Sequence, residues 1–207
     1  MNDLIVVSGP SGVGKGTLIS GLLKADPTSR VTVSDTTRQI RQGEENGKDY
    51  NFITSEEFKA RIDAGYYVEW EHFYDTYYGT PKNQIESAKP GEKVLLELDP
   101  KGALSIKRAY PDAALVFVLP ATMGQLAERL RARGTENSRQ LQLRAARVAE
   151  EMALIDHFDY AVVNDDITKA TADFCELVSS LRFRMQSNRN LVAKLLLEAK
   201  ELSNDLH

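Results

Sequence analysis

The chain of 207 residues has a single cysteine, and its charges nearly balance. One cysteine, Cys175, excludes an internal disulfide and a metal site built from several cysteines. We interpret Cys175 as a small buried residue on a helix, and the scarcity of cysteine as typical of the reducing cytoplasm. The net charge of −4 gives no long-range attraction to nucleic acid or to an acidic membrane, so we expect neither as a partner.

Long apolar runs are also missing. The N-terminal run Leu4–Val7 is short and follows Asp3, so we expect neither a signal peptide nor a membrane span there. The three histidines lack the spacing of metal ligands. Hydrophobic residues make up 42% and charged residues 27% of the chain, which is ordinary for a globular enzyme with one sizeable α/β core.

A glycine-rich segment lies between the first apolar run and a helical pattern; it consists of Gly9, Pro10, Ser11, Gly12, Val13, Gly14, Lys15, Gly16 and Thr17. This order predicts a phosphate-binding loop for ATP, with backbone N–H groups, the positive end of a helix and Lys15 facing the phosphates. A plain glycine turn would not explain a lysine at this spacing. Gly16 stands where a serine or threonine commonly meets Mg²⁺, so the nearest hydroxyl is that of Thr17.

Apolar runs alternate with helical patterns along most of the chain. The runs predict five strands, over residues 4–7, 30–34, 93–99, 114–119 and 159–164. The alternation predicts an α/β fold with a central parallel five-stranded sheet flanked by helices. Ligands of such sheets bind at the carboxyl ends of the strands. The glycine-rich loop falls at such an end, and so do Ser34, Glu97, Asp99 and Asn164.

Residues 35–82 depart from this alternation and predict a small inserted subdomain. We expect a polar loop over 35–49, a helix from about residue 55 to 64 and a strand over 66–73. Tyr77–Pro81 is interpreted as a turn, followed by a short helix to about Lys89.

The chain is helical from Thr168 onward, as one long helix or two. The leucines of this region form an apolar stripe that core packing or a dimer contact explains better than a ligand site; they are Leu191, Leu195, Leu196 and Leu202.

Three further features need a common explanation. They are Thr36–Arg41, continued by Gly43-Glu44 and Gly47–Tyr50; Glu69-Trp70 with Tyr78–Thr80; and Arg129–Thr135. Together with the glycine-rich loop they resemble guanylate kinases, from about Leu4 to Asp166, and the C-terminal helices resemble those of bacterial members. The resemblance implies a P-loop kinase that transfers the γ-phosphoryl group of MgATP to GMP, and to dGMP, in purine nucleotide metabolism.

The resemblance also implies roles for particular residues. Those that hold GMP are Ser34, Arg38, Arg41, Tyr50, Glu69, Tyr78, Thr80 and Glu97. Those that act on the transferring phosphoryl group are Lys15, Arg38, Arg129, Arg133 and Arg144. Thr17 and Asp99 are expected beside magnesium, mostly through water, although Asp99 could also simply cap a helix. Asn164 matches a position near adenine.

The chemistry of these residues agrees with the implied roles. Arginine forks donate in pairs to a phosphate dianion. A carboxylate such as that of Glu69 can accept from both N1–H and the N2 amine of guanine, whereas adenine offers neither group. Phosphoryl transfer needs no protein nucleophile, because placing two phosphates in line and stabilising their charge suffices.

The implied domains are a core of residues 1–33, 83–125 and 146–207, a GMP-binding subdomain of residues 34–82 and a lid of residues 126–145. Oligomeric state stays open between a monomer and a homo-oligomer, including a dimer through the C-terminal helices. Two other functions compete: a protein-binding module of the same fold, and a kinase for another acceptor such as AMP or a sugar phosphate. Lys15 and the lid arginines argue against the first, and Ser34, Glu69 and Thr80 against the second.

Overall fold

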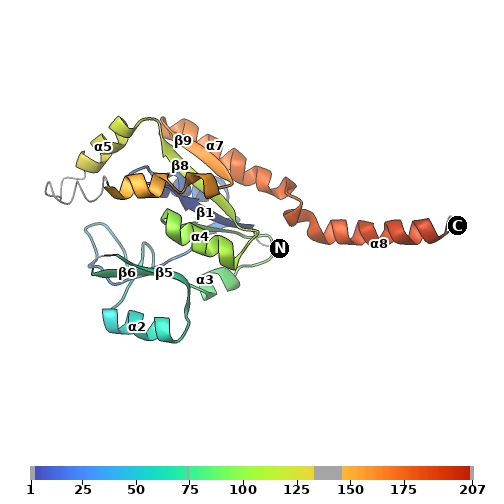
Figure 1. Cartoon of the computed structure of the whole chain (residues 1–207), viewed down its shortest axis with the longest axis horizontal. Coiled ribbons are helices and arrows are strands. Elements are labelled where there is room, and N and C mark those ends of the chain that lie inside the picture. The colour runs from blue at the N-terminus through green and yellow to red at the C-terminus, as the bar shows by residue number, and fades with distance from the viewer. Residues whose placement is uncertain (1–2, 74, 133–145, 206–207) are drawn as a thin grey trace.

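The computed structural model describes residues 3–73, 75–132 and 146–205 (Figure 1). Elements up to the middle of the chain are β1 Asp3–Ser8, α1 Lys15–Ala25, β2 Ser29–Val31, β3 Asp35–Thr36, β4 Asn51–Phe52, α2 Ser55–Asp63, β5 Tyr67–Phe73, β6 Thr76–Pro81 and α3 Asn83–Glu86. Those that follow are β7 Lys93–Glu97, α4 Pro100–Ala109, β8 Ala114–Pro120, α5 Met123–Ala132, β9 Tyr160–Asn164, α7 Ile167–Ser180 and α8 Arg189–Asp205. A helical segment also spans residues 146–152.

The larger sheet has the order β2-β7-β1-β8-β9, and all its neighbouring strands are parallel. This confirms the predicted central five-stranded sheet. Strand β2, Ser29–Val31, is shorter than the predicted strand over residues 30–34. The Thr32 N–H still donates to the Leu95 carbonyl oxygen at 2.8 Å, after which the chain leaves this sheet and enters the smaller one at Asp35. The carboxyl ends of β1, β7 and β9 lie at one edge, as a parallel sheet requires.

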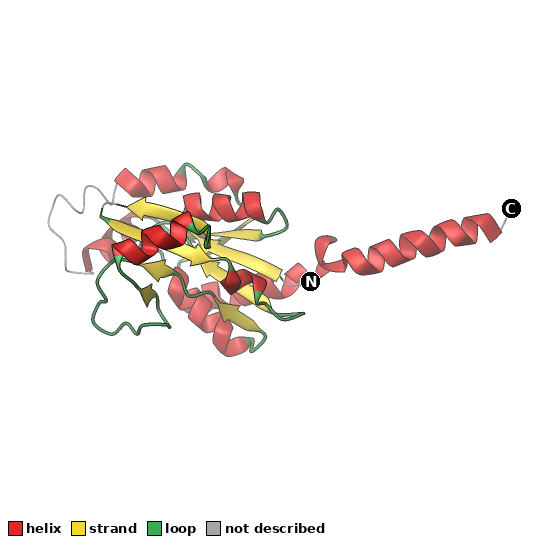
Figure 2. Ribbon diagram, turned by 90° about the horizontal axis from the view of Figure 1, so that it is seen from below, coloured by secondary structure: helices red, strands yellow, loops and turns green. Residues whose placement is uncertain are grey.

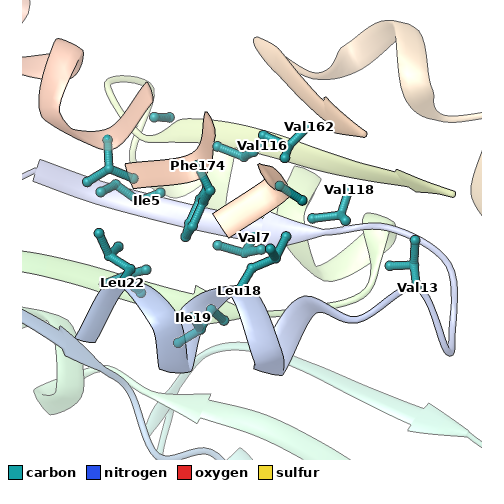
Figure 3. Close-up of a cluster of buried hydrophobic side chains, with 14 of the residues drawn as sticks. Ile5, Val7, Val13, Leu18, Ile19, Leu22, Val116, Val118, Val162 and Phe174 are labelled. Carbon is teal, nitrogen blue, oxygen red and sulfur yellow. The ribbon is translucent and has the colours of Figure 1, made fainter. Parts of the chain in front are cut away.

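Helices cover both faces of this sheet (Figure 2). Successive side chains of β1 point to opposite faces because the strand period is two residues. Ile5 and Val7 pack into a core with residues of α1 and α7, drawn in Figure 3 with Leu18, Leu22 and Phe174. Val6 faces the other way and packs in a second cluster with Ala103 and Ile106 of α4. Because β1 is buried on both faces of the sheet, the start of the glycine-rich loop is held in one position at the sheet edge.

The smaller sheet has the order β4-β3-β6-β5, in which β3 and β4 are parallel and the other pairs antiparallel. The expectation of a turn at Tyr77–Pro81 was wrong, because these residues form strand β6 and the short helix begins only at Asn83. Tyrosine and threonine favour strands, and β6 pairs with β5 so that Glu69 faces Thr80. The predicted helix and strand over 55–73 are confirmed as α2 and β5.

A buried carboxylate fastens this sheet to α2. Asp35 is fully buried and accepts hydrogen bonds from Arg61 at 2.5 Å, from the Tyr67 hydroxyl at 2.7 Å and from Asn51 at 2.9 Å. Phe58 of α2 stacks on the Tyr67 ring, with centroids 4.5 Å apart. The strand that carries Glu69 is therefore held by both polar and apolar contacts.

The C-terminal region forms two helices, α7 and α8, separated by two short 3-10 turns. Helix α7 packs against α1, whereas α8 extends away from the rest of the molecule (Figure 1). Core packing is therefore the wrong explanation for the leucine stripe, since Leu191, Leu195, Leu196 and Leu202 are 52–62% exposed. In the part of the chain that the structure describes, no helix is both long and apolar enough to cross a membrane.

Candidate active site

The glycine-rich loop joins β1 to α1 at the edge of the larger sheet. Gly9 and Gly14 have φ of 133° and 102°, which other residues rarely adopt, and a Cβ at Gly9 would lie 2.4 Å from the Val118 carbonyl oxygen. Lys15 begins α1, and its ammonium group donates to the Gly9 carbonyl oxygen at 2.7 Å. The Ser11 N–H donates to a carboxylate oxygen of Glu151 at 3.3 Å. The loop thus already holds an anionic oxygen on a backbone N–H.

Asn164 and Arg129 donate hydrogen bonds to the backbone of this loop. Asn164 is 2% exposed and donates to the Val13 carbonyl oxygen at 2.6 Å, so as it lies it does not offer a surface to adenine. Arg129, in the last turn of α5, donates to the same Val13 oxygen at 3.3 Å and to the Asn164 carbonyl oxygen at 3.4 Å. Arg133 and Arg144 lie outside the described residues.

Three predicted base-binding residues form one hydrogen-bonded row. The Ser34 and Thr80 hydroxyls are 3.3 Å apart, and the Thr80 hydroxyl donates to Glu69 at 2.6 Å. Burial, then the charge of Asp99, raises the pKa of Glu69 to about 7, against the lowering effect of the Thr80 hydrogen bond. Antiparallel pairing of β5 with β6 brings Glu69 and Thr80 together, and Ser34 precedes β3, which pairs with β6.

Arg38 lies among aromatic rings and is held by Glu44. Its two terminal nitrogens donate to the two Glu44 oxygens at 2.7 and 2.6 Å, and its guanidinium lies 5.0 Å from the Tyr50 ring centroid. The Tyr50 and Tyr78 rings meet edge to face at 6.0 Å. The Arg38 fork lowers the pKa of Glu44 to about 2. Arg41 is exposed, and its backbone N–H donates to Glu44 at 2.9 Å.

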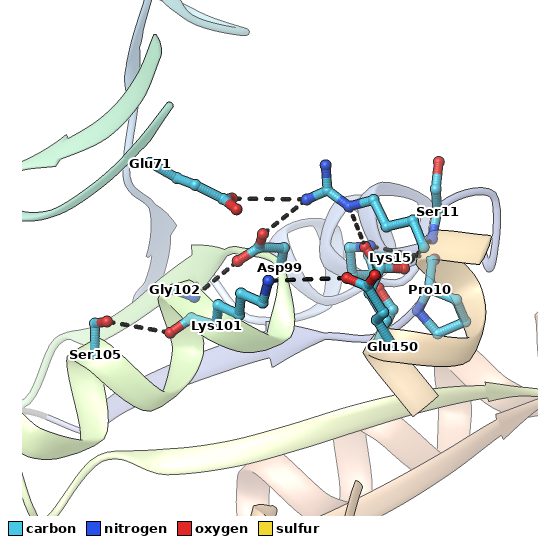
Figure 4. A network of polar contacts seen from close by, with 12 residues as sticks. Pro10, Ser11, Lys15, Glu71, Asp99, Lys101, Gly102, Ser105 and Glu150 are labelled. Atoms are coloured by element: carbon cyan, nitrogen blue, oxygen red, sulfur yellow. Dashed lines mark hydrogen bonds and ion pairs between the residues drawn. The ribbon is translucent and has the colours of Figure 1, made fainter. Parts of the chain in front are cut away.

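Carboxylates gather where β7 ends. Asp99 caps α4 by accepting from the Gly102 N–H at 2.7 Å, so the capping interpretation is confirmed, and its other oxygen accepts from Arg147 at 2.8 Å (Figure 4). Burial, then the neighbouring Asp99, raises the pKa of Glu71 well above its usual range. Glu97 is exposed, and its Oε2 would lie 3.2 Å from a Cβ at Gly16.

Sequence reasoning assigned no part in this site to Arg147, Glu71 or Glu151. An ion pair four residues apart on a helix, such as Arg147–Glu151, is a local signal that could have been found. The bond from Arg147 to Asp99 joins residues 48 positions apart, and no pattern in one sequence predicts it.

Comparisons with known proteins identify the family of this chain. The family model described as "Guanylate kinase" matches residues 1–181. The curated guanylate kinase of Symbiobacterium thermophilum is 41% identical over 203 residues, covering 98% of this chain and 96% of that protein. That of Gloeobacter violaceus is 45% identical over 171 residues, covering 82% and 83%.

A solved structure of guanylate kinase from Anaplasma phagocytophilum superposes with a TM-score of 0.73 at 28% sequence identity, covering 88% of this chain and 87% of that one. Family model, relatives and fold therefore all indicate the same family. The chain belongs to the guanylate kinase family and is an ATP:GMP phosphotransferase.

Proposed function

We propose that the two nucleotides of this reaction bind on either side of the edge where β1 and β7 end. ATP phosphates would lie in the loop Gly9–Thr17, where they replace the Glu151 oxygen on the Ser11 N–H. Lys15 would turn from the Gly9 carbonyl oxygen to the outer phosphates, a modest rearrangement because its ammonium already lies at the loop. Asn164 would act here by supporting the loop backbone, where Arg129 also lies before the lid closes.

GMP would bind against the smaller sheet. The observation that carries this assignment is the row Ser34–Thr80–Glu69, in which Thr80 and Glu69 are buried and the carboxylate has no cation bonded to it among the described residues. Guanine supplies the two N–H groups that such a carboxylate lacks. The GMP phosphate would lie at Arg38, Tyr50 and Tyr78, and Arg41, exposed on the same loop, would turn toward it. dGMP differs only at the ribose and should bind in the same way.

Thr17 in α1 and the acids at the end of β7 have the chemistry that suits Mg²⁺. Thr17, Glu97 and Asp99 carry hydroxyl and carboxylate oxygens, the ligand type that this cation prefers. In the ranges that the structure describes there is no group of three or more acidic, histidine or cysteine side chains able to hold a metal. Mg²⁺ would then be held mainly by the nucleotide phosphates and water, with Thr17 and Asp99 bound to that water. When bound, it would neutralise charge on the phosphates.

Transfer requires the two phosphates in line and water excluded. We place the core at residues 1–33, 83–125 and 146–207, the GMP-binding subdomain at 34–82 and the lid at 126–145. Closure of the lid would bring Arg129, Arg133 and Arg144 over the transferring group, where arginine forks stabilise the charge that spreads over its oxygens. Arg38 would hold the attacking phosphate in position.

Helix α8 would pair with α8 of a second copy. Its leucines are more than half exposed, and an isolated helix of this length is marginally stable in water. Sedimentation should give a dimer that Leu195→Asp converts to a monomer; an unchanged sedimentation coefficient would count against this contact. The single cysteine continues to favour a cytoplasmic location.

The base-reading assignment is tested with Glu69→Gln. Its amide keeps an acceptor for the Thr80 hydroxyl but presents an N–H where guanine also donates. GMP affinity should fall at least about 10-fold while ATP affinity is preserved. Equal weakening of both nucleotides, measured by calorimetry, would show that Glu69 does not read the base.

A further inference from the structure

Arg147 stands where three parts of the molecule meet. Its Nε donates to Glu151 at 2.7 Å, and its terminal nitrogen donates to Asp99 at 2.8 Å and lies 3.6 Å from Glu71. Its guanidinium also covers the Phe73 ring, 3.9 Å from the centroid. These partners come from the helical segment 146–152, from the start of α4 and from β5. The residues around Arg147 line a cavity of about 200 Å³.

One end of this cluster reaches the phosphate loop. The Glu151 oxygen that does not bond Arg147 accepts from the Ser11 N–H. A phosphate oxygen of ATP needs that same N–H, so ATP must displace Glu151. After displacement, Arg147 would still pair with Glu151 and compensate its charge. Without it, a free carboxylate would face the incoming phosphates.

The other end reaches the GMP-binding sheet. Glu69, Glu71 and Phe73 alternate along β5 and so face the same side of the strand. Glu69 is the proposed base-reading residue, and the next two residues on that face, Glu71 and Phe73, both contact Arg147. A base bound to Glu69 would therefore hold β5 in place, and β5 is the strand whose Glu71 and Phe73 contact Arg147. This makes a continuous chain of contacts from the guanine site to the loop that binds ATP.

We propose that Arg147 is a positioning residue for phosphoryl transfer, which holds Asp99 beside the phosphate loop, keeps the displaced Glu151 paired and couples the GMP site to the ATP site. The proposal rests on the placement of GMP at Glu69 and of ATP at the loop given above. A guanidinium suits this task because its planar fork can serve several carboxylates at once while stacking on an aromatic ring. Lysine at this position would keep the charge but lose the fork.

The coupling is measured by calorimetric titration of a non-hydrolysable ATP analogue with Mg²⁺, in the absence and presence of saturating GMP. In the wild-type chain, GMP should tighten the analogue about 5-fold or more, and the reverse experiment should give the same factor. Arg147→Met should bring this factor close to one and weaken the analogue about 10-fold even without GMP. Arg147→Lys should restore analogue affinity better than it restores the coupling, a distinction that loss of folding cannot produce.

The matched control is Lys101→Met, since Lys101 lines the same cavity in an exposed ion pair with Glu150 at 3.9 Å (Figure 4). It should leave the coupling factor unchanged. An equal factor in wild type and Arg147→Met, or no coupling in the wild type, would overturn the proposal. GMP affinity from the same titrations tests the GMP site separately: failure of GMP to bind wild type would contradict that placement, whereas binding without coupling contradicts only the role of Arg147.

Discussion

The ionised Glu69 carboxylate, the form that would bind guanine, is expected to lower the free energy of unfolding because it is buried. The substitution Glu69→Gln measures this loss of stability. Glu69 is 8% exposed, and burial raises the pKa of its carboxyl group from 4.5 to about 7. Between these two values the folded chain binds a proton that the unfolded chain releases, so the free energy of unfolding falls as pH rises through this window. The shift corresponds to about 3 kcal/mol, reached above the folded-state pKa.

Glutamine has nearly the same shape and carries no charge, so the substitution should remove this loss. The variant should be more stable than wild type by about 3 kcal/mol near pH 8, and by less than about 1 kcal/mol near pH 5. Urea unfolding of the ligand-free proteins at the two pH values measures the difference. Glu56→Gln, at an exposed position in the first turn of α2, is the matched control, because it makes the same substitution at a carboxylate that is not buried. A stability difference that is the same at both pH values would refute the reasoning.

Three other outcomes follow from the structure. Asp35→Ala should lower the free energy of unfolding by about 3–5 kcal/mol, because it leaves Arg61 and the Tyr67 hydroxyl without their buried partner; a loss below 1 kcal/mol in urea unfolding would contradict this. Gly16→Ser should lower kcat by crowding Glu97, and adding Glu97→Asp, one methylene shorter, should recover much of the loss; purely additive effects in the double-mutant cycle would show that the two positions are not matched. Lys15→Ala should lower kcat strongly while GMP still binds, and an unchanged rate would rule out its phosphate role.

The parts that were predictable from sequence are those whose signals are local. The glycine-rich loop, the apolar runs of the central sheet and helix α2 each depend on a few adjacent residues, and the structure has these elements close to their predicted positions. The strand Thr76–Pro81 was missed because Gly79 and Pro81 suggest a turn. Its pairing with β5, which overrides that local preference, is a tertiary contact.

Site residues divide in the same way. Glu69 and Thr80 were predictable through the family pattern, and strand pairing then explains why they touch. The partners that hold the site in its ligand-free form were not predictable, because Arg147 and Asp99, or Ser11 and Glu151, meet only after the whole chain has folded. Asn164 was expected near adenine, and in the structure it is buried beneath the loop with its amide on the Val13 carbonyl oxygen. No sequence pattern shows how deeply this side chain is buried.

The most direct test of the central claim, that the row Ser34–Thr80–Glu69 selects guanine as the acceptor base, is a coupled assay of ADP release with GMP, dGMP, AMP, UMP and CMP in turn. The account predicts rapid turnover with GMP, and with AMP a kcat/KM lower by about 10⁴, because adenine leaves the buried carboxylate without a donor. Strong turnover with AMP and none with GMP would contradict it.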